Sequence, residues 1–323
     1  MATLTGARRI GVPNMKLIRL KGWPILQQLH LEESLFRTSS DNICIFNDGT
    51  NVPSIVMGAS GKLAELVEIK PVLRDQVPVI KRFSGGGTVI VDKDTVFVTF
   101  ICNKDAIPGL QPYPRPIMSW SSQIYDHVFD KACNFQLREN DYVFGNHKFG
   151  GNAQSITKRR WIHHTSFLWD YEIENMAYLK LPTRAPEYRL ARSHTEFICR
   201  MKDYLARSEF IDKTISALGS HFSMEHVELE PSQQSLAADF VPSSREITIQ
   251  EMEEALAELA SEIVGTLLGE PHSNSGPSSS SCNARGDPPV VSDCWFNCTL
   301  EDISGEDKQQ RLRKDRTSVV YLI

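Results

Sequence analysis

The 323-residue sequence lacks a long hydrophobic run, a strong net charge and cysteine pairs at metal-binding spacing. No apolar stretch approaches the roughly 18 residues that a membrane helix needs, so we expect no membrane association. A net charge of −5 excludes a global basic field of the kind that attracts nucleic acid. The seven cysteines form no Cys-x-x-Cys pair, which indicates reduced thiols in an intracellular compartment. Cys294 and Cys298 have only Cys282 nearby as a further ligand, so we predict no metal site.

The two ends of the chain differ in composition from the middle. No acidic residue precedes Glu32, and residues 1–14 contain two arginines. We therefore expect a flexible start or a short mitochondrial targeting segment at 1–14. Residues 271–289 are rich in Pro, Ser, Gly and Asn, so residues 269–323 are predicted to be largely disordered.

The most informative stretch is VIKRFSGGGTVIVD, residues 79–92. Its three glycines, Gly85 to Gly87, interrupt a β-rich run and expose backbone N–H groups in conformations that a side chain would forbid. Such a loop can bind an anion, and Arg82 beside it supplies a forked cation. The alternative is a glycine-rich hairpin turn, which the loop alone does not exclude.

Two later stretches carry further candidate residues. Residues 140–154 (NDYVFGNHKFGGNAQ) place one lysine, Lys148, just before a glycine pair and between strand-like residues. Residues 161–170 (WIHHTSFLWD) put two histidines in front of an apolar strand. Each motif alone is weak, but three of them in this order are far more specific.

The three stretches together resemble the family of lipoate–protein ligases, lipoyltransferases and octanoyltransferases, which is related to the biotin–protein ligases. The positions that fit the family pattern are Lys81 to Asp92, Asn140, Asp141, Lys148, Gly150, Gly151, Ala153, His163 and His164. The resemblance implies an α+β fold, in which a mixed, mainly antiparallel sheet flanked by helices forms a biotin/lipoate ligase-like catalytic domain over residues 15–222. Residues 223–268 are expected to add a C-terminal strand and helix.

The resemblance also implies an activity. Members of the family attach lipoate or octanoate, through an acyl-adenylate, to one lysine of a lipoyl-carrier domain. The implied substrates are lipoate and ATP with Mg²⁺. The implied partners are apo lipoyl domains of 2-oxoacid dehydrogenase E2 subunits and the glycine cleavage H protein. The chain is expected to act as a monomer, without nucleic acid, and in mitochondria, where lipoylated enzymes reside; the cytoplasm is the alternative location.

Lys148 receives the catalytic role from this resemblance. Its ammonium would bridge the acyl carbonyl and the α-phosphate oxygens as an electrostatic anchor, not as a nucleophile. Residues 89–91 would line an apolar slot for the acyl chain. The other residues expected to bind the acyl-adenylate are Arg82, Ser84, Gly85, Gly86, Gly87, Thr88, Asp141, Gly150, Gly151, Ala153, His164 and Ser166.

Two of these residues have more than one possible role. His164 would hydrogen-bond the ligand or accept a proton from the incoming lysine; alternatively, it is a strand histidine satisfied by the backbone. Asp141 would orient the target amine or help to hold Mg²⁺; alternatively, it caps a turn.

Two positions depart from the family pattern. The strand after the glycines ends Val91-Asp92 where many ligases have His-Asp, and Ser155 stands where a basic residue often follows the lysine. Both missing groups would contact the adenylate. Transfer from a preformed acyl-adenylate is therefore an alternative to a complete ligase reaction.

Other activities remain as alternatives. An octanoyltransferase that takes the acyl group from a carrier protein would need a cysteine as acyl carrier. No cysteine lies between Lys148 and Arg192, and Cys199 is predicted to lie in a helix over residues 195–205, which disfavours that route. A biotin–protein ligase and a non-catalytic binding protein are the remaining alternatives.

The hydrophobic pattern predicts most of the secondary structure. A helix from Pro24 to about Arg37 is expected, with Glu32 and Glu33 on its solvated face. Four prolines exclude a regular element at residues 105–116, and a helix is expected to follow at 118–135.

Overall fold

A computed structural model describes residues 11–129, 131–229 and 240–268 of the chain. Most of the predicted targeting segment and all of the predicted disordered tail, with its three cysteines, lie outside the described residues. The described residues up to Ala260 belong to one compact unit, and residues 261–268 belong to a second. Among the described helices, none combines the length and the apolarity that crossing a bilayer requires.

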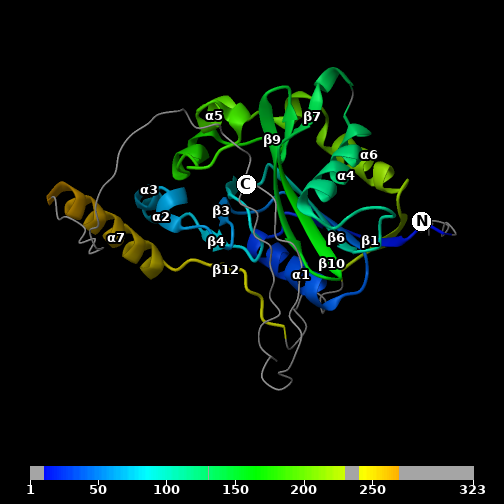
Figure 1. The fold of residues 1–323 in the computed structure, drawn as a ribbon, viewed down its shortest axis with the longest axis horizontal. Coiled ribbons are helices and arrows are strands. Elements are labelled where there is room, and N and C mark those ends of the chain that lie inside the picture. The colour runs from blue at the N-terminus through cyan, green and yellow to red at the C-terminus, as the bar shows by residue number, and fades with distance from the viewer. Residues whose placement is uncertain (1–10, 130, 230–239, 269–323) are drawn as a thin grey trace, which may run out of the picture. The chain divides into compact units, whose positions relative to one another are not determined.

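The larger of two sheets has eight strands (Figure 1). Their spatial order is β11 (Ser223–Val227), β1 (Asn14–Lys21), β2 (Ile43–Asp48), β6 (Thr95–Asn103), β10 (Arg160–Leu168), β9 (His147–Ile156), β8 (Asp141–Phe144) and β7 (Phe135–Arg138). β1 pairs in parallel with β2 and β11, whereas the ladders from β2 to β7 are antiparallel. This mixed, mainly antiparallel sheet confirms the predicted fold class.

The smaller sheet holds the glycine-rich stretch. Its strands lie in the order β12 (Arg245–Glu246), β4 (Val79–Lys81), β3 (Ser54–Met57) and β5 (Thr88–Val91). β3 is parallel to β4 and antiparallel to β5, so the connection from β4 to β5 must cross the C-terminal end of β3. That connection, residues 82–87, is called the glycine loop below.

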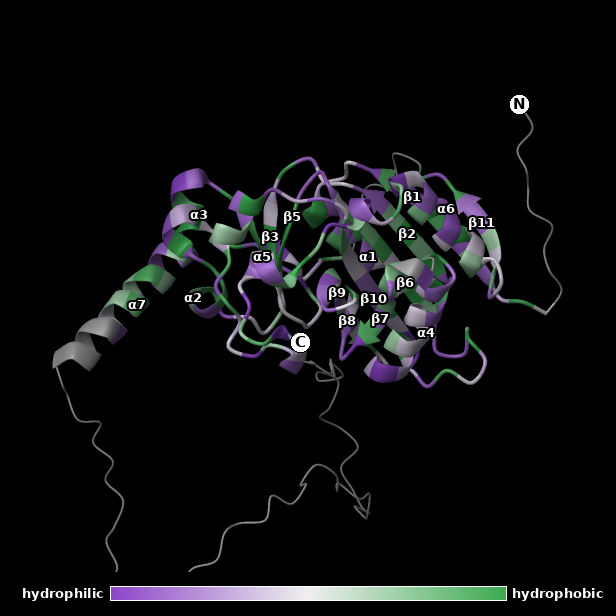
Figure 2. Cartoon of the chain, turned by 90° about the horizontal axis from the view of Figure 1, so that it is seen from above, coloured by the Kyte–Doolittle hydropathy of each residue, from purple (hydrophilic) through white to green (hydrophobic). Residues whose placement is uncertain are grey.

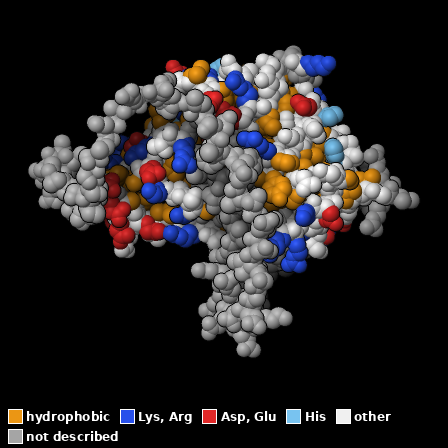
Figure 3. All heavy atoms as spheres, in the orientation of Figure 1, with side chains coloured by type: hydrophobic (Ala, Val, Ile, Leu, Met, Phe, Trp, Pro, Cys, Tyr) orange, Lys and Arg blue, Asp and Glu red, His pale blue; other side chains and the backbone are white. Residues whose placement is uncertain are grey.

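Helices cover the sheets on both sides. They are α1 (Ile25–Thr38), α2 (Leu63–Leu66), α3 (Ile69–Asp75), α4 (Pro114–Asp126), α5 (His194–Phe197), α6 (Arg207–Leu218) and α7 (Ile249–Leu268), with short 3₁₀ turns η1 (Lys131–Cys133), η2 (Ile173–Tyr178), η3 (Glu187–Arg189) and η4 (Met201–Asp203). α1 confirms the helix predicted after Pro24. α7 carries both hydrophobic and hydrophilic residues, and acidic side chains gather over it (Figures 2 and 3).

Side chains of the larger sheet alternate between two hydrophobic cores, as the pleat of a strand requires. In β6, Val96 and Val98 belong to the core that includes α4 and α6, whereas Phe97 and Ile101 belong to the core that includes α1 and the smaller sheet. The sheet is therefore buried on both faces, and its face toward α1 and the smaller sheet packs in the second of these cores.

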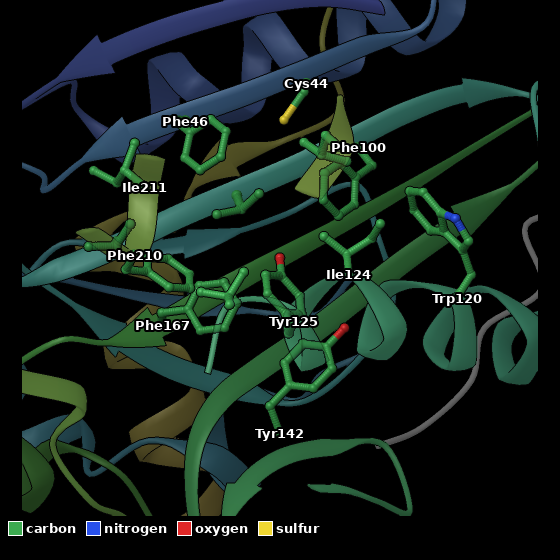
Figure 4. Close-up of a cluster of buried hydrophobic side chains, with 14 of the residues drawn as sticks. Cys44, Phe46, Phe100, Trp120, Ile124, Tyr125, Tyr142, Phe167, Phe210 and Ile211 are labelled. Atoms are coloured by element: carbon green, nitrogen blue, oxygen red, sulfur yellow. The ribbon is translucent and has the colours of Figure 1, made fainter. Parts of the chain in front are cut away.

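The core that includes α4 and α6, called the first core below, is rich in aromatic rings (Figure 4). Tyr125 of α4 makes edge contacts with Tyr142 and Phe167, at ring-centroid distances of 5.0 and 5.1 Å, and stacks on Phe210 of α6 at 6.2 Å. Aromatic pairs of this kind add to the free energy gained by burial alone. This core fixes β8, β9 and β10, the strands that carry the second and third sequence motifs.

Two predictions about helices were wrong in part. α4 begins at Pro114, inside the stretch predicted to be irregular, and it ends at Asp126 rather than Phe135. Proline suits the first turn of a helix because the N–H that it lacks would have no partner there. The helix predicted at 195–205 is instead the short α5, a bridge between Ile198 and Lys148, and η4.

Candidate functional site

A cavity of about 560 Å³ lies between α1, the smaller sheet and the ends of β8, β9 and β10. One part of its wall is apolar and includes Ile25, Leu29, Val56, Val89, Val91 and Phe97. Another part carries the basic residues Lys62, Arg82, Lys148, Lys180, Arg184 and Arg189 and the acidic residues Glu32, Glu65 and Asp141. With six bases against three acids, the cavity suits a ligand that has an apolar chain and an anionic group.

Arg82 organises the glycine loop. Its guanidinium is buried and donates to the carbonyl oxygens of Gly85 (2.8 Å), Gly87 (3.0 Å) and Val56 (3.3 Å). Burial lowers the pKa of Arg82 to about 10. The structure therefore places these guanidinium donors on the loop's own backbone, where they hold its shape.

Two glycines allow the loop to lie against the end of β3. A Cβ added to Gly58 would lie 2.1 Å from the carbonyl oxygen of Gly86, and one added to Gly86, whose φ is +103°, would lie 2.7 Å from the Arg82 guanidinium. The Gly58 N–H donates to the Gly87 carbonyl at 3.2 Å. The space at Gly58 is thus filled by the glycine loop itself.

Lys148, on β9, is part of the cavity wall. Its ammonium pairs at 2.5 Å with Asp141 Oδ1, and Asp141 Oδ2 accepts a hydrogen bond of 2.7 Å from the Tyr188 hydroxyl. Asp141 is 2% exposed, whereas the Lys148 side chain is 24% exposed. A Cβ on Gly151 would lie 4.0 Å from the ammonium, so the small residue beside Lys148 leaves room around it. The buried carboxylate of Asp141 therefore orients the Lys148 ammonium.

His164 sits in a chain of hydrogen bonds. Its Nδ1 lies 2.8 Å from Glu32 Oε2, and its Nε2 lies 2.6 Å from the Ser84 hydroxyl. Glu32 Oε1 also accepts from Gln28 (2.7 Å) and Thr99 (2.6 Å). With Glu32 ionised, Nδ1 carries the proton and Nε2 accepts from Ser84. Both ring nitrogens thus have side-chain partners.

The prediction that Glu32 and Glu33 lie on a solvated helix face is wrong. Their exposed fractions are 0% and 1%. Glu33 pairs with Arg37 at 3.0 Å and accepts from Ser243 at 2.5 and 2.8 Å. A carboxylate can be buried when charged or hydrogen-bonding partners replace its water, and here those partners come from distant parts of the chain.

Two residues considered from the sequence, a motif histidine and a candidate acyl-carrier cysteine, lie outside the cavity wall. His163 is fully buried between Tyr142 and Gln154, with contacts of 3.2 and 3.0 Å, and burial lowers its pKa to about 3. The Cys199 thiol contacts the His147 carbonyl, and burial raises its pKa to about 12. His163 is therefore a neutral core residue, and Cys199 has none of the acidity of an activated thiol.

Most of the residues predicted from the sequence lie together. Lys148, Arg82, Gly86, Gly87, Thr88, Asp141, Gly151, Ala153, His164 and Ser166 all line the cavity. Ser84, Gly85 and Gly150 do not, although Ser84 contacts His164. The prediction missed Glu32, Tyr188 and the basic residues of the segment 180–189, which carries no motif. Within the described part of the chain, no group of three or more His, Cys, Asp or Glu is arranged to hold a metal ion.

Solved structures share this fold. A bipartite lipoate protein ligase from Thermoplasma acidophilum, solved in a study that includes its E2 lipoyl domain, is 17% identical, with a TM-score of 0.55 over 70% of this chain and 90% of that one. A lipoate-protein ligase A bound with ATP is 16% identical, with a TM-score of 0.54 over 70% of this chain and 92% of that one. The chain thus shares its fold with these two ligases.

Sequence comparison gives the family. An inactive lipoate–protein ligase 2 from Plasmodium falciparum is 29% identical over 256 residues, covering 59% of this chain and 65% of that protein. The lipoate-protein ligase LplJ of Bacillus subtilis is 28% identical over 129 residues, covering 39% of this chain and 37% of that protein. The sequence model of the lipoyl protein ligase A/B catalytic domain matches residues 24–223. The chain therefore belongs to the lipoate–protein ligase family, and its cavity lies in the family's catalytic domain.

Proposed function

We propose that the chain binds an acyl-adenylate in this cavity and transfers the lipoyl or octanoyl group to a lysine of a lipoyl-carrier domain. The observation that carries the proposal is that Lys148, the glycine loop, a basic segment and an apolar patch all line one cavity. An acyl-adenylate has a chain, a reactive carbonyl and a phosphate, and each of these matches one part of that wall.

The apolar part of the wall suits the acyl chain. Leu29 and Phe97 lie there, together with residues 89–91, which were predicted to form the slot for the acyl chain. Burying about five methylenes at ~0.8 kcal/mol each contributes roughly 4 kcal/mol of binding free energy. A lipoyl chain and an octanoyl chain both meet this requirement.

The phosphate is expected to contact cations that the sequence motifs did not include. Because the guanidinium of Arg82 donates to three backbone carbonyls, we assign the phosphate first to Arg184, which lines the cavity from the segment after η2. Lys180 and Arg189 line the cavity from the same segment; each donates to one backbone carbonyl, of Ala64 and Arg192, and keeps further N–H donors for the phosphate. Arg184 is exposed and can adapt to a ligand. Arginine matches phosphate in a forked geometry that lysine cannot supply.

Lys148 is placed to act on the carbonyl. The amine of the target lysine attacks the acyl carbon, the bond from that carbon to the phosphate oxygen breaks, AMP leaves with the electron pair, and the amine loses a proton. A lysine ammonium has three donors, so Lys148 can keep Asp141 and still hydrogen-bond the oxygen on which charge develops. One preorganised donor of this kind contributes roughly 3–4 kcal/mol to the transition state.

Transfer is the step that the residues favour over adenylation. Adenylation uses ATP with Mg²⁺, and the two buried carboxylates of the cavity already have partners: Asp141 pairs with Lys148, and Glu32 contacts His164. Glu65 forms only a solvent-exposed pair with Lys62. The related Plasmodium protein carries the name of an inactive ligase. Adenylation of lipoate on this chain is the second candidate, because a ligase of this fold has been solved with ATP bound.

A thioester route through a carrier protein is less consistent with the site. None of the four described cysteines lines the cavity. Cys44 and Cys102 are buried in the core that includes α4 and α6, Cys133 packs against that core, and the Cys199 N–H donates to the Lys148 carbonyl.

We further propose that the acceptors are lipoyl domains of E2 subunits and the glycine cleavage H protein, as substrates of a mitochondrial monomer. The Thermoplasma ligase, which was studied together with its E2 lipoyl domain, supports the first of these acceptors.

One assay separates the candidates. Purified protein is incubated with an apo lipoyl domain and, in turn, with lipoyl-adenylate, with lipoate plus Mg²⁺ and ATP, and with octanoyl carrier protein, and the acceptor's mass is measured. We expect the acceptor to gain the lipoyl mass with lipoyl-adenylate. Gain with lipoate and ATP as well establishes adenylation on this chain, and gain with octanoyl carrier protein alone overturns the adenylate mechanism. No gain with any donor leaves a non-catalytic binding protein.

A further inference from the structure

We infer that Ser244, in the extension beyond the family's catalytic domain, is a positioning residue for the glycine loop. The family match ends at residue 223, so the segment 243–247 lies outside it. We call this segment the C-terminal brace. The inference rests on the proposed function for its effect on ligand binding, whereas its effect on the loop can be measured without any ligand.

The brace is anchored on α1. Glu33, 1% exposed, accepts from the Ser243 hydroxyl at 2.5 Å and from the backbone N–H groups of Ser243 and Ser244 at 2.8 and 3.3 Å. The ring of His30, one turn earlier, contacts the Ser244 carbonyl at 2.9 Å. A buried carboxylate without these donors would carry a large desolvation cost, so the brace and Glu33 depend on each other.

The same segment extends the smaller sheet. β12 pairs antiparallel with Ile80 and Lys81 of β4, and the Ile247 N–H donates to the Val79 carbonyl at 2.7 Å. Ile247 is 8% exposed and packs in the core of the smaller sheet. The brace therefore runs beside β4 up to the residue where the glycine loop begins.

At that point the brace contacts the loop directly. The Phe83 N–H, between Arg82 and Ser84, donates to the Ser244 hydroxyl at 2.9 Å, and Ser244 is 2% exposed. Phe83 is itself buried and its ring lies 5.8 Å from that of His164. On its two sides are the guanidinium that shapes the loop and the hydroxyl that contacts His164. Ser244 thus fixes the peptide between the two residues that shape the loop.

Through this contact the C-terminal brace can affect the shape of the cavity, although it contributes no residue to the cavity wall. None of the brace residues lines the cavity. Loss of the Ser244 hydroxyl leaves the Phe83 N–H buried without this acceptor, and the loop can recover the lost hydrogen bond only by moving. We expect this movement to displace Gly86 and Gly87 and to weaken ligand binding.

The test compares Ser244→Ala with a matched control, Ser243→Ala, and a rescue, Ser244→Thr. Ser243→Ala removes a hydroxyl from the same anchor but leaves the Phe83 acceptor in place. Hydrogen exchange of peptides that cover residues 79–90 is measured without ligand. Affinity for a non-hydrolysable lipoyl-sulfamoyl adenosine, and KM and kcat for lipoyl-adenylate, are measured in the full chain.

We expect Ser244→Ala to accelerate amide exchange in the loop and to weaken binding of the analogue about tenfold, with KM rising and kcat changing less than about twofold. Ser243→Ala should leave loop exchange and KM close to wild type, and Ser244→Thr should restore both. Unchanged loop exchange in Ser244→Ala, or equal effects of the two alanine variants, would overturn the inference. If the wild type fails to bind the analogue, the proposed function fails, and the exchange measurement still decides the role of Ser244.

Discussion

Tyr188→Phe tests how the position of Lys148 is fixed. The tyrosine hydroxyl donates at 2.7 Å to Asp141, whose other oxygen holds the Lys148 ammonium, and both Tyr188 and Asp141 are buried. The pKa of the Tyr188 hydroxyl is raised by its burial and by the neighbouring Asp141 carboxylate, so the hydroxyl stays protonated and can donate. The substitution removes one hydrogen bond to a charged acceptor and leaves the ring in place.

The expected size of the effect follows from the burial of the Tyr188–Asp141 hydrogen bond. A hydrogen bond to a buried charged group contributes about 1.5–3 kcal/mol. If the cost appears in the transition state, kcat/KM for transfer from lipoyl-adenylate falls by about 10- to 150-fold, since each 1.36 kcal/mol is a factor of ten. If Asp141 moves without effect on Lys148, the cost appears only in the free energy of unfolding, which urea titration measures.

The matched control is Tyr113→Phe, which removes a hydroxyl from a ring that is 62% exposed and does not line the cavity. It should leave both transfer and unfolding unchanged. Full activity of Tyr188→Phe together with a lower unfolding free energy would refute the positioning role. If neither kcat/KM nor the free energy of unfolding changes, the hydrogen bond contributes to neither catalysis nor stability.

Three further outcomes are expected. Gly58→Ala should reduce affinity for the lipoyl-sulfamoyl analogue in a calorimetric titration, because its Cβ would lie 2.1 Å from the Gly86 carbonyl and displace the loop; unchanged affinity would contradict the loop packing. Cys199→Ser should retain transfer from lipoyl-adenylate, because the thiol lies outside the cavity wall; loss of transfer would favour a thioester route. His163, whose pKa burial lowers to about 3, binds its proton in the unfolded state first as the pH falls, so the free energy of unfolding should drop by about 2 kcal/mol between about pH 7 and pH 5. His163→Gln should lose that part of the slope in urea titrations, and an unchanged slope would contradict the burial of a neutral imidazole.

Short-range patterns predicted the elements that carry the site. Helical spacing after Pro24 predicted α1, and alternating β-rich runs predicted the strands on both sides of the glycine loop. The placement of Lys148 and His164 at one site with that loop was implied by the family resemblance, and both residues line the cavity. The helix and the strands depend on a few neighbouring residues, so the sequence pattern alone was enough to predict them.

The missed features depend on partners far away in the chain. Glu32 and Glu33 look like a solvated pair because their helix gives no sign of His164, 132 residues later, or of Ser243, 210 residues later. Tyr188 has no motif, and its role becomes visible only when η3 lies beside Asp141. Polar residues satisfied by distant partners have no periodicity to detect, which is why the hydrogen-bonded part of the site could not be predicted.

The central claim is that Lys148 stabilises the charge that develops as an acyl-adenylate transfers its acyl group. Single-turnover transfer from lipoyl-adenylate to an apo lipoyl domain tests it, with Lys148→Ala compared with Lys158→Ala, which removes an exposed lysine from a turn. We expect the transfer rate to fall at least about 100-fold in Lys148→Ala, with its circular dichroism spectrum unchanged, and to stay at the wild-type value in Lys158→Ala. Transfer at the wild-type rate by a folded Lys148→Ala protein would contradict this claim.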